Sequence, residues 1–177
     1  MRQIVLLRGI NLGARNRVAM AQLRALLTSA GFADVRSYLQ SGNVVLSSDT
    51  SPQELARECE RQIARGFGLD IDVVVRTRAE LAEVVDRNPL GEVALNPKRY
   101  QVSFLSAELE AETVRSIAAL ALAPERLVAI GRELYAWHPD GVARSRLWTR
   151  LAGRGLGVTA TARNWTTVTN LLALADE

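Results

Sequence analysis

A long polar connection near the N-terminus contains residue types that hold anions. An apolar run at residues 3–7 is followed by Arg8-Gly9-Ile10-Asn11-Leu12-Gly13-Ala14-Arg15-Asn16-Arg17-Val18, and a helical pattern begins at residue 20. Glycine lets backbone amides approach a ligand, a helix N-terminus offers unpaired N–H groups, and arginine supplies positive charge. The loop therefore predicts anion binding by Arg8, Arg15 and Arg17, with Asn11 orienting the ligand. The alternative is a solvated loop whose arginines face water.

The C-terminal part of the chain carries two further basic segments, each preceding a helical pattern. The first, residues 141–147, contains Arg144, and the second is Arg163-Asn164-Trp165-Thr166-Thr167. We expect Asn164 to cap the last helix and Arg163 to lie where the positive helix end favours an anion. Trp165 is expected either to stack on a base or ring of a ligand or to pack against the sheet.

A polar turn supplies the remaining candidate residues. Gln40-Ser41-Gly42-Asn43 lies between two strand-like runs, and its composition is typical of a tight hairpin. Asn43 is a second side chain that could orient a ligand. Ser41 is the best candidate for a nucleophile, although the sequence shows no base to activate it.

The charge is distributed unevenly along the chain. The net charge is only +3, but residues 1–48 carry six arginines and one acid, and residues 141–175 carry five arginines and no acid. The stretch 49–140 is acidic, with a balance of −5. Basic segments at both ends and an acidic middle favour an anionic ligand for the terminal segments.

Several kinds of site are disfavoured. One cysteine and one histidine cannot build a zinc site, and no cofactor motif is present, since the first loop lacks the Gly-Lys-Ser/Thr ending of a P-loop. Cys59 falls in register with Leu55 and Ile63, which indicates an inert core thiol. His138 opens a His-Pro-Asp-Gly turn, where a general base usually lacks the partner and pocket that it needs.

The periodicity predicts the same order of elements twice, β-α-β-β-α-β-α. The expected strands are 3–7, 34–39, 43–47 and 71–75, then 100–105, 127–130, 134–137 and 158–162; the expected helices are 20–30, 51–66 and 77–88, then 108–121, 145–153 and 165–175. This split βαβ pattern predicts an α+β fold, a tandem duplication of two ferredoxin-like βαββαβα units. The expected domains are 1–88 and 100–177, joined by a linker at 89–99 and packed as one compact body. A single doubly wound parallel sheet is disfavoured by the two short hairpins.

Three separated motifs carry a resemblance to a known family. They are Leu6-Leu7-Arg8-Gly9-Ile10-Asn11-Leu12-Gly13, Tyr38-Leu39-Gln40-Ser41-Gly42-Asn43-Val44-Val45 and Arg163-Asn164-Trp165-Thr166-Thr167-Val168. With these motifs the chain resembles the bacterial family catalogued as domain of unknown function 1697, over nearly its whole length. The resemblance implies a duplicated ferredoxin-like α+β fold and lends no activity and no catalytic residues. Ala14 departs from a commoner Gly in the first loop, which weakens a strictly glycine-based cradle.

The hypothesis favoured by these residues is binding of a phosphorylated small molecule or nucleotide in a basic cleft between the two halves. Single-stranded nucleic-acid binding is the first alternative, but the strands 4–7 and 43–47 lack the aromatic residues with which ferredoxin-like sheets hold RNA. A protein-interaction module without catalysis, and an enzyme that uses arginine electrostatics on a phosphate or carboxylate, are the others. No apolar run approaches the roughly 18 residues of a membrane span, and the charged N-terminus does not resemble a secretory signal, so we expect a cytoplasmic protein.

Overall fold

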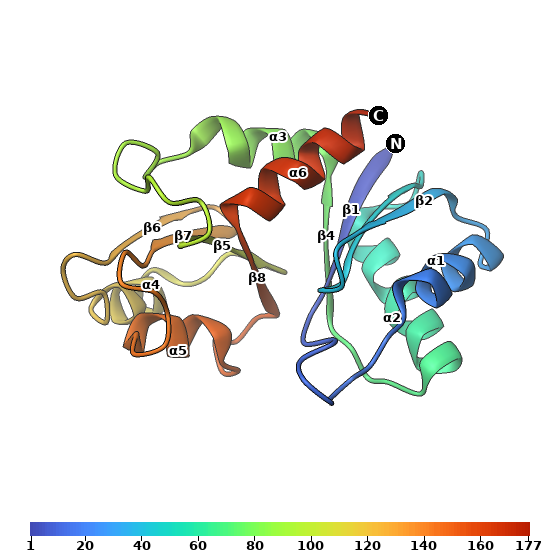
Figure 1. The fold of residues 1–177 in the computed structure, drawn as a ribbon, viewed down its shortest axis with the longest axis horizontal. Coiled ribbons are helices and arrows are strands. Elements are labelled where there is room, and N and C mark those ends of the chain that lie inside the picture. The colour runs from blue at the N-terminus through green and yellow to red at the C-terminus, as the bar shows by residue number, and fades with distance from the viewer. The chain divides into compact units, whose positions relative to one another are not determined.

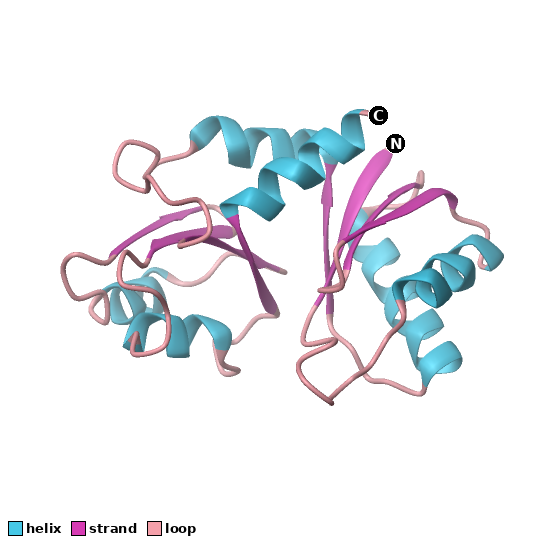
Figure 2. Ribbon diagram, in the orientation of Figure 1, coloured by secondary structure: helices cyan, strands magenta, loops and turns pink.

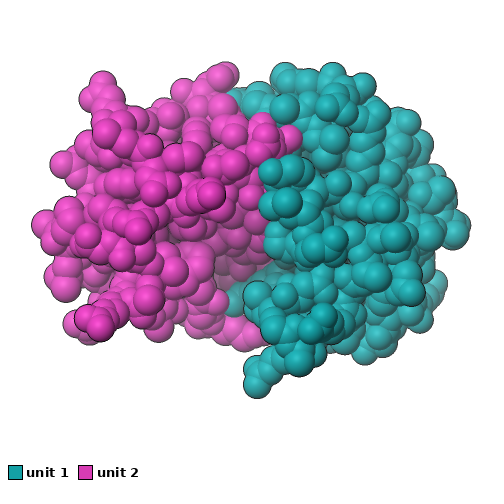
Figure 3. Space-filling model, in the orientation of Figure 1, with its two compact units in different colours: residues 1–83, 171–177 teal, residues 84–170 magenta.

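The computed structural model describes the whole chain, residues 1–177, as two compact α+β units (Figure 3). The first unit comprises residues 1–83 and 171–177, and the second comprises residues 84–170. The sequence-based division assigned residues 171–177 to the second half, whereas these seven residues pack with the first. None of the helices combines the length and the apolar character that crossing a membrane requires.

The first unit is one antiparallel sheet with two helices on one face (Figures 1 and 2). Its elements are β1 (Arg2–Leu7), α1 (Met20–Ser29), β2 (Ala33–Tyr38), β3 (Asn43–Ser47), α2 (Pro52–Phe67) and β4 (Val73–Thr77), followed by α3 (Arg78–Arg87), which crosses into the second unit. The strand order is β2-β3-β1-β4. This order, with the sequence β-α-β-β-α-β, is the ferredoxin-like topology.

The second unit repeats this plan. Its elements are β5 (Tyr100–Leu105), α4 (Ala111–Ala118), β6 (Arg126–Ile130), β7 (Glu133–Trp137), α5 (Arg146–Ala152) and β8 (Ala160–Asn164), followed by α6 (Trp165–Asp176). The sheet order is β6-β7-β5-β8, again antiparallel throughout. The predicted α+β duplication is therefore confirmed.

The cores form because alternate strand residues face the helices. In the first unit Val5 and Leu7 of β1 pack with Leu55 and Ile63 of α2. Cys59 lies in the same cluster and is fully buried, and burial raises the pKa of its thiol to about 12. The thiol is protonated at neutral pH, in line with the expected inert core cysteine.

Helix starts follow the local sequence. The Ser51 side chain accepts a hydrogen bond from the Glu54 amide, and the Glu54 carboxylate accepts one from the Ser51 amide. Thr77 and Glu80 form the same reciprocal pair at the start of α3. Both helix starts are therefore capping boxes, each of which satisfies two backbone donors that the helix leaves free.

Two strands lie two residues further along the chain than predicted. The strand expected at 71–75 is Val73–Thr77, and the strand expected at 158–162 is Ala160–Asn164. Each expected strand ended one residue before an arginine. Arg76 and Arg163 instead lie within their strands with buried side chains, 1% and 8% exposed.

Candidate functional site

The N-terminal loop, residues 8–19, is an ordered structure held by two asparagines. Asn11 and Asn16 both adopt positive φ, 52° and 49°, a conformation that asparagine tolerates better than most residues. The Asn11 amide N–H donates to Asn16 O at 3.0 Å, and Asn16 Nδ2 donates to Gly9 O at 3.0 Å. The loop therefore folds back on itself instead of extending into solvent.

The Asn11 side chain is occupied by the protein backbone. Its Nδ2 donates to Val18 O at 2.9 Å and to Gln40 O at 2.6 Å, and its Oδ1 accepts from the Val18 amide at 2.8 Å. The sequence had suggested that Asn11 orients a ligand. In the structure this side chain joins the loop to its own end and to the hairpin at residues 39–42.

The hairpin between β2 and β3 is also closed by internal hydrogen bonds. Asn43 is fully buried, and its Nδ2 donates to Tyr38 O at 3.1 Å and to Ser41 Oγ at 2.9 Å. Gly42 has a φ of 83°, and a Cβ there would lie 2.8 Å from the Cβ of Leu7, so the turn requires glycine. Ser41 is exposed, and no histidine is near it in the first unit, since the chain's one histidine is His138.

The three predicted cations of the first unit differ in exposure. Arg8 is partly buried, and its amide donates to Asp72 O at 2.9 Å. Arg15 and Arg17 are exposed near the loop tip and form no ion pair. The structure thus brings the loop and the hairpin together, but Arg15 and Arg17 lie in an exposed stretch of the loop and do not line the first-unit pocket formed by Gln22, Leu26 and Phe67.

The β8–α6 junction uses its polar residues within the second unit. Asn164 Oδ1 accepts from the Thr167 amide at 2.9 Å, which confirms the predicted cap. Arg163 is buried and donates from Nη1 to Thr161 Oγ1 at 2.7 Å and to Ala162 O at 2.8 Å. Burial lowers the pKa of Arg163 to about 10, so the guanidinium is charged at neutral pH.

Trp165 stacks on Tyr100, with ring centroids 4.9 Å apart and an interplanar angle of 18°. One face of the indole is therefore covered by the second unit itself. Of the two roles expected for Trp165, the structure shows the packing contact.

His138 has surroundings that the sequence did not reveal. It is fully buried, and its Nδ1 lies 2.6 Å from Glu125 Oε2, which also accepts from Ser145 Oγ at 2.5 Å. The expectation that this histidine lacks a partner was wrong, because Glu125 is distant in sequence. The three residue types match a hydrolase triad, but the geometry does not: serine and carboxylate both lie on the Nδ1 side, and Nε2 has no partner.

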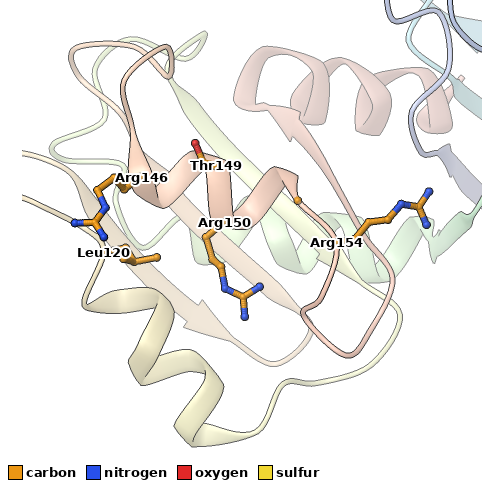
Figure 4. Close-up of a pocket in the computed structure, with 6 residues that line it drawn as sticks. Leu120, Arg146, Thr149, Arg150 and Arg154 are labelled. Atoms are coloured by element: carbon orange, nitrogen blue, oxygen red, sulfur yellow. The ribbon is translucent and has the colours of Figure 1, made fainter.

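Arg144, an exposed candidate residue, lines a pocket with Glu125 and Ser145. A separate pocket nearby is lined by three arginines that were not among the predicted site residues. Its lining residues are Leu120, Arg146, Thr149, Arg150, Gly153 and Arg154, and its volume is about 340 Å³. Figure 4 shows the arginines spread along α5 and the turn that follows it.

The arginines of this pocket, Arg146, Arg150 and Arg154, are called the arginine row below. Arg146 and Arg150 lie four residues apart in α5 and so share one side of the helix, and Arg154 lies four residues further on, in the turn after α5. That spacing was visible in the sequence and was the signal that could have identified them. No group of three or more His, Cys, Asp or Glu side chains lies close enough to hold a metal ion.

These observations define a duplicated ferredoxin-like α+β protein with arginine-rich segments in each unit. The chain belongs to the family described as Protein of unknown function (DUF1697), whose model matches residues 1–135. It is also similar to a structure titled as that of conserved bacterial protein SP0830 from Streptococcus pneumoniae, with a TM-score of 0.78 and 24% identity over 98% of both chains. At that identity the likeness establishes the fold alone. No curated protein matches the chain.

Proposed function

We propose that this protein binds a phosphorylated small molecule or nucleotide, and that the arginine row of the second unit holds its phosphate groups. The observation that carries the proposal is a pocket whose lining includes three arginines and no acidic residue. The ligand class is the one that the charge distribution predicts. The residues assigned to this ligand, Arg146, Arg150 and Arg154, were not among the site residues predicted from the sequence.

The electrostatics of the row favour an anion. Arg146 and Arg150 form no ion pair with any carboxylate. Like charges four residues apart destabilise a helix by roughly 0.2–0.5 kcal/mol, because their side chains are neighbours on its surface. A bound anion removes this repulsion, so part of the binding free energy comes from relief of an existing cost.

Phosphate matches the row better than carboxylate. Guanidinium presents paired N–H donors that fit two phosphate oxygens at once, and the hydrogen bonds are charge-assisted. The hydroxyl-bearing Thr149 and the apolar Leu120 also line the pocket and offer contacts to a sugar or another uncharged part. A volume of about 340 Å³ lies at the lower end of the range of small-molecule sites.

The row does not favour base-stacking recognition of single-stranded nucleic acid. No aromatic residue lines the pocket, and Trp165 is stacked on Tyr100. Stacking on aromatic side chains supplies much of the affinity of proteins that hold single strands. Recognition through phosphate alone is therefore the better fit.

A thermal-shift screen tests the proposal. Nucleotides, sugar phosphates, pyrophosphate and a short RNA are each added to the full chain at low and at high salt. A ligand at 100 times its Kd adds about 2.7 kcal/mol to the stability of the folded state, which such a screen detects. We expect a phosphorylated small molecule to stabilise the protein at both salt concentrations, because a shaped pocket resists screening better than a diffuse basic surface.

The matched variants are Arg146→Gln, Arg150→Gln and, as control, Arg144→Gln. Loss of one charge-assisted hydrogen bond costs about 1.5–3 kcal/mol, so each of the first two weakens binding by roughly 10- to 100-fold. Arg144 is exposed and lies outside this pocket, so its variant keeps the wild-type affinity. Equal affinity of all four proteins for the phosphorylated ligand overturns the assignment.

A further inference from the structure

A second pocket of the second unit has a different chemistry. It has a volume of about 550 Å³ and shares no residue with the arginine row. Its lining residues are Leu122, Ala123, Pro124, Glu125, Asp140, Gly141, Ala143, Arg144 and Ser145. They come from the loop before β6 and from the loop between β7 and α5, so two separate loops form its walls.

The Glu125 carboxylate, which lines this pocket, is held in place by hydrogen bonds within the protein. Glu125 Oε2 accepts from Ser145 Oγ at 2.5 Å and from His138 Nδ1 at 2.6 Å. Ser145 Oγ in turn accepts from the Trp148 amide at 3.0 Å, and the Trp148 ring meets the buried His138 edge-on. Because its neighbours are fixed, the Glu125 carboxylate is fixed too.

Only one oxygen of Glu125 is used in this network. No hydrogen bond in the structure reaches Oε1, and the side chain is 15% exposed. An ionised carboxylate accepts several hydrogen bonds, so Glu125 has capacity for a donor from a bound molecule. The donor that satisfies a partly desolvated carboxylate best is a cationic one.

Charges of opposite sign lie elsewhere around the same pocket. Asp140 and Arg144 are both exposed lining residues, and neither forms an ion pair. The pocket is therefore lined by two carboxylate residues and one arginine, together with the apolar Leu122 and Pro124. Leu122 is 63% exposed, so its side chain is available for contact with a bound molecule.

We propose that this pocket binds a small zwitterion of the amino acid class. The ligand's ammonium group donates to Glu125 Oε1, with Asp140 adding negative charge beside it. Its carboxylate meets the Arg144 guanidinium, and its apolar part covers Leu122 and Pro124. A purely anionic ligand is repelled by the two carboxylates, and a simple cation leaves Arg144 without an anion.

This inference stands apart from the proposed phosphate site. The two pockets have no residue in common, and the ligands differ in charge. Either site can therefore be present without the other. Variants in one pocket also serve as controls for the other.

Calorimetric titration of the full chain with individual L-amino acids tests the proposal. Each amino acid that binds is compared with its decarboxylated amine and with its N-acetyl derivative, which each lack one of the two charges. We expect the zwitterion to bind at least 10-fold more tightly than either derivative, since each derivative loses a charge-assisted hydrogen bond worth about 1.5–3 kcal/mol. Equal binding of zwitterion and amine, or no binding by any amino acid, overturns the proposal.

Two variants locate the site, and neither disturbs the internal network. Arg144→Gln and Asp140→Asn change exposed residues that make no ion pair, so both are expected to fold. Arg144→Gln weakens amino acid binding by at least 10-fold and Asp140→Asn by a smaller factor, whereas Arg146→Gln leaves it unchanged. Unaltered binding by Arg144→Gln contradicts the placement of the ligand carboxylate.

Discussion

At the scale of residues, the two buried arginines occupy equivalent positions in the repeat. Arg76 of β4 pairs with Ile4 of β1, and Arg163 of β8 pairs with Val102 of β5. The strand registers on both sides match, so the duplication extends to individual side chains. Each arginine lies one residue before the residue that caps the following helix.

A charged side chain at a buried position requires hydrogen bonds, because an unpaired buried charge is costly. Arg76 Nη1 donates to Val75 O at 3.0 Å, and Arg163 donates to Thr161 and Ala162. These contacts indicate a structural role for Arg163 within the second unit. A ligand-binding role was the expectation from sequence.

We predict that Arg163→Met lowers the free energy of unfolding by about 1–3 kcal/mol, because hydrogen bonds of a buried charged donor are lost. Arg144→Met is the control, since Arg144 is exposed and unpaired and its replacement is expected to change stability by no more than about 0.5 kcal/mol. Chemical denaturation of both variants measures the difference. Equal midpoints for the two contradict the structural role.

At the scale of elements, the N-terminal loop depends on one side chain. Asn11 makes three hydrogen bonds that tie the loop to Val18 and to the hairpin at Gln40. Asn16 makes one such bond, to Gly9. Both residues have positive φ, so their replacement by alanine introduces similar backbone strain.

We therefore predict that Asn11→Ala destabilises the protein more than Asn16→Ala. With each hydrogen bond worth about 0.5–1.5 kcal/mol, the difference between the variants is about 1–3 kcal/mol. Thermal unfolding followed by circular dichroism gives the comparison, and hydrogen exchange of the Val18 amide reports the local opening. If both variants unfold at the same temperature, Asn11 does not organise the loop as described.

Most elements could be predicted because their signals are local. The capping boxes at Ser51 and Thr77 determine where two helices begin, and apolar runs identify the strands. Neither signal depends on the rest of the chain. The strands β4 and β8 were misplaced by two residues because local reasoning treats arginine as exposed. Its burial depends on neighbours from other strands, which a single segment does not contain.

The candidate site was less predictable for the same reason. The basic character of residues 141–175 was evident from composition, and the spacing of Arg146, Arg150 and Arg154 was a local signal that was available. The contact of His138 with Glu125 joins two loops 13 residues apart, and nothing in either loop predicts it. Asparagine is a residue type that often orients ligands, but the hydrogen bonds of Asn11 to Val18 and Gln40 can be seen only in the folded structure.

At the scale of the whole molecule, the end of the chain packs with its beginning. Residues 171–177 belong to the first unit, where Leu171 is 1% exposed. Arg78 Nε lies 2.7 Å from Asp176 Oδ1, and Arg36 Nη1 lies 2.6 Å from Glu177 Oε2. Two ion pairs thus hold the C-terminal segment to the first unit.

The Arg78–Asp176 pair predicts a pH dependence. The hydrogen bond from Arg78 holds the pKa of Asp176 below its ordinary value. A carboxyl with a lowered pKa in the folded state contributes stability above the unfolded-state value, about 3.9, and loses it as the pH falls through the folded-state value. The contribution is small, because both side chains are about half exposed and solvent screens the pair.

We expect Asp176→Asn to lower Tm slightly at pH 7, and its Tm to converge on that of the wild type as the pH falls below about 3.9, the unfolded-state value, and the wild-type carboxyl takes up its proton. Asp140→Asn, which removes an exposed carboxylate without an ion pair, should show no such convergence. Calorimetric scans across this pH range test the prediction. A gap between wild type and Asp176→Asn that stays constant with pH rules it out.

The central claim is that guanidinium groups of the arginine row contact phosphate. The most direct test is a set of ¹H–¹⁵N correlation spectra of the arginine Nε–H groups, assigned by mutation and recorded during titration with pyrophosphate. The account predicts saturable shifts for Arg146 and Arg150 at the same ligand concentration, and no shift for Arg144. Shifts spread evenly over all exposed arginines, or none at Arg146 and Arg150, contradict it.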